Sequence, residues 1–248
     1  MFEYQSLFDA RGGLYNRANR VYPEARAEEA AAMLRHLALS PRSRWLDVLA
    51  GGGYLSERAR AEGLPPASAA CDGSLPFLRA SENTAVCVAR AEGLPFGEGR
   101  FDAVACLAAL HHSEDPRAVF RELLRVTAPH GRAALGDAAD DSPTACFLNG
   151  FVDRHTASGH RGRFYALETL EGFAAAAGGC RIESERLGVH WTLPSSRDAV
   201  RFCRDLFGLV SSTSDGEIEA GLADLGAAAV PGGFQIPWTM HYVSAVRT

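Results

Sequence analysis

Lysine is absent from the 248-residue chain, and all 25 of its basic residues are arginine. A chain without lysine cannot form a Schiff base with a carbonyl substrate, attach pyridoxal phosphate or build the lysine-containing phosphate loop. The 30 acidic residues exceed the arginines and give a formal net charge of −5. Because nucleic-acid-binding proteins gather basic residues into a patch or stripe, this balance predicts no nucleic-acid partner.

Long apolar runs and closely spaced cysteines are also missing. No stretch approaches the ~20 apolar residues that a membrane-spanning helix needs, and the first residues lack the apolar segment of a secretory signal. None of the six cysteines stands in a C-x-x-C pair, the spacing typical of zinc and redox sites. We therefore expect no membrane span, buried free thiols and a cytoplasmic location. The composition leaves the oligomeric state open.

Apolar runs alternate with segments of helical spacing between residues 44 and 138. This alternation with short links predicts right-handed crossovers and a parallel, doubly wound α/β sheet. Two later apolar runs suit an antiparallel pair at the edge of the same sheet. The predicted strands span residues 44–50, 67–72, 84–90, 101–110, 131–138, 180–193 and 234–248, and the predicted helices span 24–38, 54–63, 74–81, 114–127, 167–177, 196–208 and 215–227.

A glycine-rich turn follows the first of these strands, in the segment WLDVLAGGGYLS (45–56). The strand ends near Asp47, and Gly51 and Gly53 allow positive φ and a close approach of the backbone to a ligand. The helix that follows presents free N–H groups at its start. Asp72 ends the next strand, where a carboxylate can accept two hydrogen bonds from a ribose diol. The pattern therefore indicates a nucleotide-like site, with a simple tight turn as the alternative.

Two blocks further along make the pattern more specific: LPF-x3-RFDAV (94–104), which leads into CLAALHH (106–112), and ELLRVTAPHGR (122–132). Together with the D-x-L-x-G-x-G turn at Asp47, they resemble the class I S-adenosylmethionine-dependent methyltransferases of the small-molecule branch. The resemblance covers residues 44–138. It implies a Rossmann-like sheet of five parallel strands with a late antiparallel pair and helical lids. It also implies methyl transfer from S-adenosylmethionine to a small organic acceptor.

The resemblance implies where the cofactor lies along the chain. The glycine turn would hold its methionine end, the acid after the second strand its ribose, and the loop after the third strand its adenine. The end of the fourth strand would face the sulfonium, and a tyrosine of segment 2–23, with Arg17 and Tyr22 as further candidates, would lie near its carboxylate. The implied cofactor contacts are Asp47, Gly51, Gly53, Asp72, Ala91, Glu92, Leu110 and Tyr15.

Two positions depart from the family pattern. Leu49 stands where the family usually has its first glycine, and Arg90 stands where many members carry an acid near the adenine. Both departures bear on methyl transfer and leave the fold unaffected. One alternative is a protein of this fold that has lost methyl transfer and serves as a cyclase or binding partner. Another is a dinucleotide-dependent dehydrogenase, although the glycine turn lacks the last glycine of that fingerprint.

Histidines are the candidates for a catalytic base. His111 lies at the sheet edge where open α/β sheets bind ligands, and His155 and His160 lie in the polar and aromatic segment 139–165. A base is needed only if the acceptor loses a proton during attack. The spacing Asp153-x-His155-x4-His160 also suggests a metal, but a single loop triad is weak evidence, and we expect no metal site.

The expected organisation is one domain, 1–248. Residues 1–40 would form an N-terminal helical lid, 41–138 the cofactor-binding core, 139–165 a substrate lid, and 166–248 a C-terminal half with the late strands. We expect 2–23 and 139–165 to enclose a partly apolar acceptor, because both segments are rich in aromatic side chains. His36 and His130 look solvated and have no assigned role.

Overall fold

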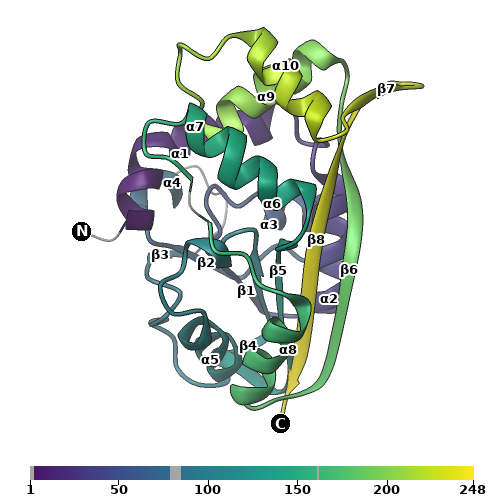
Figure 1. Cartoon of the computed structure of the whole chain (residues 1–248). Coiled ribbons are helices and arrows are strands. Elements are labelled where there is room, and N and C mark those ends of the chain that lie inside the picture. The colour runs from purple at the N-terminus through teal and green to yellow at the C-terminus, as the bar shows by residue number, and fades with distance from the viewer. Residues whose placement is uncertain (1–2, 79–84, 161) are drawn as a thin grey trace.

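The computed structural model describes residues 3–78, 85–160 and 162–248 (Figure 1). One sheet with the order β3-β2-β1-β4-β5-β8-β6 forms its centre, and β7 pairs with β8. Strands β1 to β5 are parallel, and β8 runs antiparallel to β5 and to β6. The strands are β1 (Trp45–Val48), β2 (Ala69–Asp72), β3 (Val86–Val88), β4 (Phe101–Leu107), β5 (Thr127–Ala138), β6 (Gly179–Leu193), β7 (Ala228–Val230) and β8 (Gly233–Arg247). The predicted Rossmann-like sheet with a late antiparallel pair is confirmed.

Helices pack on both faces of this sheet. The helices are α1 (Glu3–Val21), α2 (Ala27–Leu37), α3 (Tyr54–Ala61), α4 (Leu75–Leu78), α5 (Pro116–Val126), α6 (Pro143–Phe147), α7 (Asp153–His155), α8 (Leu167–Ala176), α9 (Ser196–Phe207) and α10 (Asp215–Asp224). Trp45 of β1 packs toward α2 and α3, whereas Leu46 and Val48 pack toward α5 and α8. Alternate residues of a strand point to opposite faces, so nearly every position of these short strands is buried.

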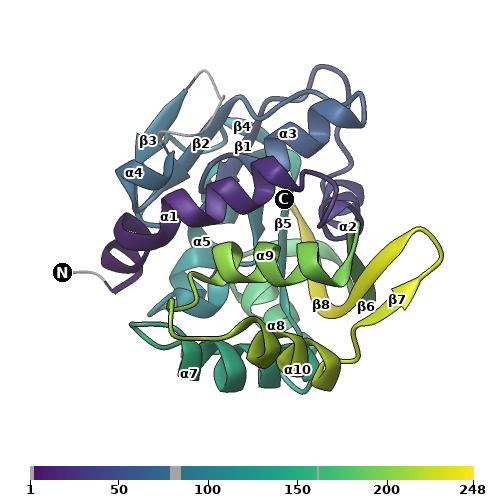
Figure 2. The ribbon, with the colours of Figure 1, turned by 90° about the horizontal axis from the view of Figure 1, so that it is seen from above.

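A third group of helices covers the carboxyl edge of the parallel strands. Helix α1 packs against α4 and α9, and Figure 2 shows α1 and α9 side by side across this edge. Helix α10 packs against α9. Segments from both ends of the chain therefore enclose the edge where the predicted cofactor residues end their strands.

Segment 139–165, the predicted substrate lid, contains a helical stretch. Residues 143–155 form a continuous helical stretch in which α6 passes through a π-helical turn (Leu148–Val152) into α7. Ser142 caps its start, accepting a hydrogen bond from the Ala145 N–H, and Pro143 occupies the first turn. The wide π turn breaks the 3.6-residue period on which sequence-based helix prediction depends.

Other expectations are corrected in detail. His36 is not solvated: its ring stacks on Tyr242 at 5.5 Å between centroids and contacts Ser244 and Glu185. The cysteines are free, but Cys146 is exposed rather than buried. The ends of two predicted elements, at residues 79–81 and 84, lie outside the described residues.

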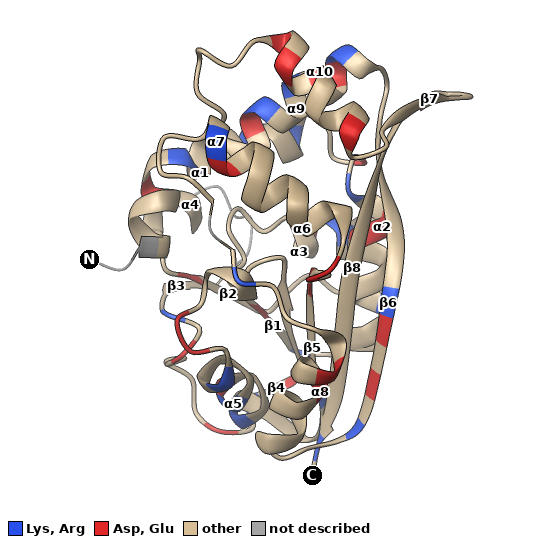
Figure 3. Ribbon diagram, viewed as in Figure 1, with Lys and Arg blue, Asp and Glu red and all other residues tan. Residues whose placement is uncertain are grey.

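Charged residues of both signs are interspersed along α9 and β6 in the view of Figure 3, whereas the charged residues of α10 are all acidic. Among the described residues, no helix is long and apolar enough to cross a membrane.

Candidate active site

Two adjoining hollows lie at the carboxyl edge of the sheet. The first hollow has an empty volume of about 490 Å³, open mouth included, and its lining includes Asp47, Leu49, Gly51, Tyr54 and Phe77. The second hollow has about 520 Å³, and its lining includes Asp137, His111, His160, Trp191 and Trp238. Phe8, Tyr15, Arg26 and Ala108 line both hollows. A ligand in one would therefore lie next to a ligand in the other.

The glycine turn forms the wall of the first hollow. Leu49, Gly51 and Gly53 have φ angles of 55°, 52° and 86°, the left-handed region that glycine adopts readily and other residues at a cost of roughly 1–2 kcal/mol. Leu49 thus keeps the backbone conformation expected of the family's glycine. Gly53 is the N-cap residue of α3. It supports the turn without lining the hollow.

Asp47 is buried at the base of the first hollow. Its Oδ2 atom has no hydrogen-bond partner among the described residues. Burial, and secondarily the charge of Asp72, raises the pKa of Asp47 to about 8. A buried carboxyl oxygen without a partner suits a polar ligand group, because such an atom otherwise costs roughly 1–3 kcal/mol.

Asp72 is fully buried at the end of β2, and its carboxylate accepts three hydrogen bonds from the chain itself. The Tyr4 hydroxyl donates to Oδ2 at 2.8 Å, the Gly51 N–H donates to Oδ2 at 3.0 Å, and the Ser74 N–H donates to Oδ1 at 2.9 Å. Burial raises the pKa of Asp72 to about 6, and these hydrogen bonds oppose the increase.

Tyr4, which binds this carboxylate, belongs to an aromatic cluster with Phe8 and Phe77. The Phe8 and Phe77 rings stack at 4.7 Å, and the Tyr4 ring lies 4.6 Å from Phe8. A Cβ atom at Gly51 would come within 2.4 Å of the Phe77 ring, so only glycine fits under it. Helices α1 and α4 thus close over the turn.

A smaller hollow lies on the other side of Tyr4 and Leu49. Its lining includes Ala91, Glu92 and Ser113, and the Ser113 hydroxyl donates to Glu92 at 2.6 Å. Arg90 contacts the Glu92 carboxylate at 3.5 Å. The structure therefore places the two predicted adenine-side residues together, next to Leu49.

Leu110, like Gly53 and Asp72, is a predicted cofactor residue that lines none of these hollows. It is 1% exposed and packs in the apolar layer toward α5. It belongs to a single 3₁₀ turn, Leu110–His112, directly after β4. Ala108 and Ala109, just before it, line the first hollow instead.

His111 and Asp137 form a hydrogen-bonded pair in the second hollow. The His111 Nδ1 lies 2.7 Å from Asp137 Oδ1, and the His111 backbone N–H donates to Oδ2 at 2.8 Å. A carboxylate on Nδ1 fixes the ring's orientation and leaves Nε2 for a ligand. Sequence reasoning missed Asp137 in this role, because its position is defined only by pairing β5 beside β4.

His112 and His160 lie beside this pair, with ring centroids 4.1 Å and 5.3 Å from that of His111. Burial lowers the pKa of His112 well below its ordinary range and that of His160 to about 3, with smaller effects from Arg11 and His111. Both rings are therefore neutral near pH 7. Among the described residues, nitrogen atoms of His111, His112 and His160 all lie within 4.8 Å of one another.

The structure separates His155 from the other two members of the predicted triad of segment 139–165. Asp153 accepts a hydrogen bond from the His160 N–H at 2.7 Å and so positions that residue. His155 instead contacts Thr213 at 3.1 Å and the Phe151 ring at 4.4 Å. It does not line the second hollow.

Of the three candidates in the N-terminal segment, Tyr15, Arg17 and Tyr22, only the first lies in the hollows. Tyr15 lines both hollows. Arg17 forms an ion pair with Asp205, and the Tyr22 hydroxyl donates to Asp198. These last two residues therefore fasten α1 and the chain after it to α9.

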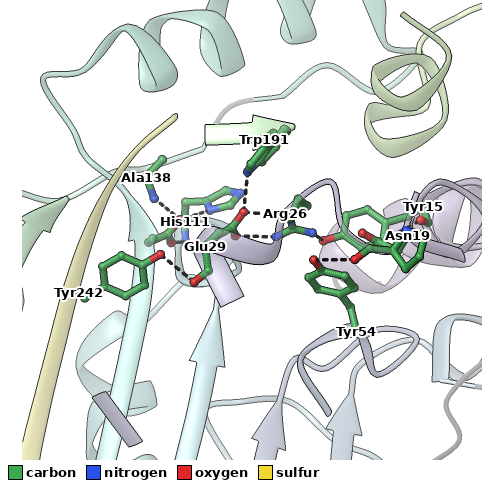
Figure 4. A network of polar contacts seen from close by, with 11 residues as sticks. Tyr15, Asn19, Arg26, Glu29, Tyr54, His111, Ala138, Trp191 and Tyr242 are labelled. Atoms are coloured by element: carbon green, nitrogen blue, oxygen red, sulfur yellow. Dashed lines mark hydrogen bonds and ion pairs between the residues drawn. The ribbon is translucent and has the colours of Figure 1, made fainter. Parts of the chain in front are cut away.

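Figure 4 shows a polar network that sequence reasoning missed. The Arg26 guanidinium donates to both carboxylate oxygens of Glu29, at 2.9 and 2.6 Å, and to the Tyr15 hydroxyl. The Trp191 indole N–H donates to Glu29 Oε2 at 2.7 Å. The network fixes Arg26 between the hollows and ties Trp191 of β6 to α2.

Aromatic side chains from the C-terminal half form the other wall of the second hollow. Trp191 and Trp238 stack at 3.9 Å, and Phe207 lies 6.2 Å from Trp191. Residues 2–23 and 139–165 contribute Phe8, Tyr15 and His160 to this hollow. The apolar wall comes from β6, α9 and β8 instead. Nothing in the sequence pattern of the two late strands distinguishes these tryptophans from ordinary core residues.

Comparison with known proteins shows which proteins this chain resembles. Residues 46–135 match a family model described as a methyltransferase domain. The demethylmenaquinone methyltransferase of Corynebacterium urealyticum is 35% identical over 139 residues, which cover 54% of this chain and 59% of that protein. A Thermotoga maritima S-adenosylmethionine-dependent methyltransferase, described as a possible histamine N-methyltransferase, matches with a TM-score of 0.65 at 14% identity, over 99% of this chain and 100% of that one. The [4+2]-cyclase SpnF matches with a TM-score of 0.63 at 16% identity, covering 98% and 95% of the two chains.

The sheet order, the glycine turn and the matched domain define a methyltransferase fold. Residues 46–135 match a methyltransferase domain, and the chain shares its fold with an S-adenosylmethionine-dependent methyltransferase, as its motifs predicted. The match favours this family over the dinucleotide alternative. The first hollow also fits the family's cofactor, because the partnerless Asp47 oxygen and the Cβ-free Gly51 face the same space.

Proposed function

We propose that the protein transfers the methyl group of S-adenosylmethionine to an oxygen of a small, partly apolar organic acceptor. The observation that carries this proposal is the direct contact between the two hollows, with the His111–Asp137 pair in the second. The Corynebacterium relative is named for a quinone-type substrate, which supports an acceptor of ring shape. That similarity spans about three-fifths of the relative, so the acceptor here follows from this chain's own residues.

Cofactor binding follows the strand ends. Asp47 and the turn through Gly51 would hold the methionine end of the cofactor. Asp72 would accept hydrogen bonds from its ribose hydroxyls. Ala91 and Glu92 would border the adenine. Arg26 lies at the junction of the hollows, where its guanidinium can meet the cofactor's carboxylate while Glu29 holds it in place.

The residues of the second hollow would orient the acceptor and remove its proton. The bound cofactor supplies an electrophilic methyl group. His111 Nε2 would take the proton of the acceptor hydroxyl while the oxygen–methyl bond forms and the sulfur–methyl bond breaks, which leaves S-adenosylhomocysteine. Asp137 would hold the imidazole in the required tautomer, and the aromatic wall would exclude water. Positioning supplies most of the rate in such a displacement.

A screen with methyl-labelled S-adenosylmethionine tests this proposal. The panel should contain hydroxylated naphthalenes, benzoates and quinols, with matching amines and carbon nucleophiles. Labelled methyl ethers that depend on His111 are the expected products. Tight binding of S-adenosylhomocysteine without transfer to any member of the panel would instead favour the alternative of a methyltransferase-fold protein that has lost methyl transfer.

A further inference from the structure

One arginine of the second hollow has no carboxylate paired with it among the described residues. This residue is Arg11 of α1, which lies in the lining of the hollow. Its Nη1 donates to the Phe207 carbonyl at 3.1 Å, and its guanidinium lies 4.7 Å above the Phe8 ring. Its Nε is buried without a hydrogen-bond partner, and within the described residues no carboxylate pairs with it. A guanidinium with a buried, unpartnered N–H is costly, so an anionic ligand group would stabilise this arrangement.

The other charged groups of the second hollow already have partners. Arg26 is paired with Glu29, and Asp137 is held by His111. Burial lowers the pKa of Arg11 itself to about 10, so the guanidinium stays charged near pH 7. The charge of Arg11 also helps to keep His112 and His160 neutral.

We propose that Arg11 binds an anionic oxygen of the acceptor, so that the acceptor is a planar aromatic molecule with an acidic group. This inference rests on the proposed function and names the acceptor class of the same site. The stacked Trp191 and Trp238 rings provide the surface for the aromatic ring. Arg11 and the histidines provide the polar end of the hollow.

Two alternatives are less compatible with the geometry. A divalent cation among His111, His112 and His160 would lie beside the Arg11 guanidinium, and like charges repel in a buried site. The cofactor's carboxylate could also pair with Arg11. However, Arg26 lines both hollows whereas Arg11 lines the second one alone.

A pair of isosteric probes tests the proposal. 2-Naphthoate carries the anion, and 2-naphthamide has nearly the same shape without the charge. Their affinities would be measured by calorimetry for the full chain saturated with S-adenosylhomocysteine. The wild type should bind naphthoate at least tenfold more tightly than naphthamide. Arg11→Gln should remove this preference, and Arg11→Lys should keep part of it.

Arg20→Gln is the matched control, because Arg20 is an exposed arginine of the same helix. It should leave the preference unchanged. Equal binding of the two probes by the wild type, no binding of either, or a preference that survives Arg11→Gln would overturn the proposal. A parallel loss of S-adenosylhomocysteine affinity in Arg11→Gln would also overturn it, since Arg11 would then serve the cofactor. Binding of S-adenosylhomocysteine by the wild type separately reports on the proposed function.

Discussion

The Tyr4 hydroxyl donates a 2.8 Å hydrogen bond to Asp72 Oδ2, the carboxylate oxygen that is also bound by the glycine turn. One side chain of the N-terminal helix therefore occupies the acceptor position that we assign to the ribose. Cofactor entry should replace this hydrogen bond with one from the ribose and shift the start of α1.

Tyr4→Phe should consequently strengthen the binding of S-adenosylhomocysteine. The change removes one hydrogen bond, worth about 0.5–1.5 kcal/mol net, from the ligand-free state only, so we expect Kd to fall roughly 2–10-fold. Tyr22→Phe is the control, because it removes a similar hydrogen bond to Asp198 outside both hollows. An unchanged or weaker affinity in Tyr4→Phe would mean that the two hydroxyls do not compete.

Gly51→Ala and Gly63→Ala separate backbone strain from steric conflict. Both glycines have positive φ, 52° and 74°, but an added Cβ meets Phe77 at 2.4 Å in the first and nothing within 4 Å in the second. Gly63→Ala should lower stability by about 1–2 kcal/mol and keep the affinity for S-adenosylhomocysteine. Gly51→Ala should lose more stability and most of that affinity. Equal behaviour of the two variants in thermal unfolding and calorimetry would contradict the close packing over the turn.

Asp47→Asn should stabilise the ligand-free protein at alkaline pH. Burial raises the pKa of Asp47 to about 8 from an ordinary 3.8, so between these values the folded chain holds a proton that the unfolded chain has lost. Stability from this group is greatest at acid pH and falls as the pH rises through 8. At pH 9 the free energy of unfolding of the variant should exceed that of the wild type by at least about 1.4 kcal/mol, the equivalent of one pKa unit.

Thermal unfolding from pH 5 to pH 9 measures this effect, with Asp224→Asn, an exposed aspartate, as the control. The advantage of Asp47→Asn should grow as the pH rises. An advantage that is constant or shrinks with pH would show that Asp47 is already ionised in the folded chain.

His111→Ala should reduce turnover while preserving cofactor affinity. A positioned base contributes about 10²–10⁴-fold, so we expect kcat to fall by at least 100-fold with any acceptor that the screen yields. Asp137→Asn should change the pH dependence of kcat, because Asp137 acts through its hydrogen bond to the His111 imidazole. His155→Ala should leave turnover close to wild type. A large loss in His155→Ala with little change in His111→Ala would assign the base to segment 139–165 instead.

The sequence predicts that the residues at the strand ends lie together, and the structure brings them together for a physical reason. Asp47, Gly51 and Asp72 follow buried parallel strands, and such strand ends meet at one edge of a sheet. Residues 11, 191 and 238 meet only through tertiary packing of α1, β6 and β8. Arg11 is one of 25 arginines and carries no local signal, so the second hollow could not be assembled from spacing alone.

The central claim is that the carboxyl edge of the sheet binds the methyl donor, and calorimetric titration with S-adenosylhomocysteine tests it most directly. The account predicts one molecule bound per chain. Asp72→Ala should weaken binding by about 1.5–3 kcal/mol, the value of hydrogen bonds to a charged group, while Asp224→Ala leaves it unchanged. A wild-type protein that binds no S-adenosylhomocysteine at millimolar concentration, or an Asp72→Ala variant with wild-type affinity, would contradict the account.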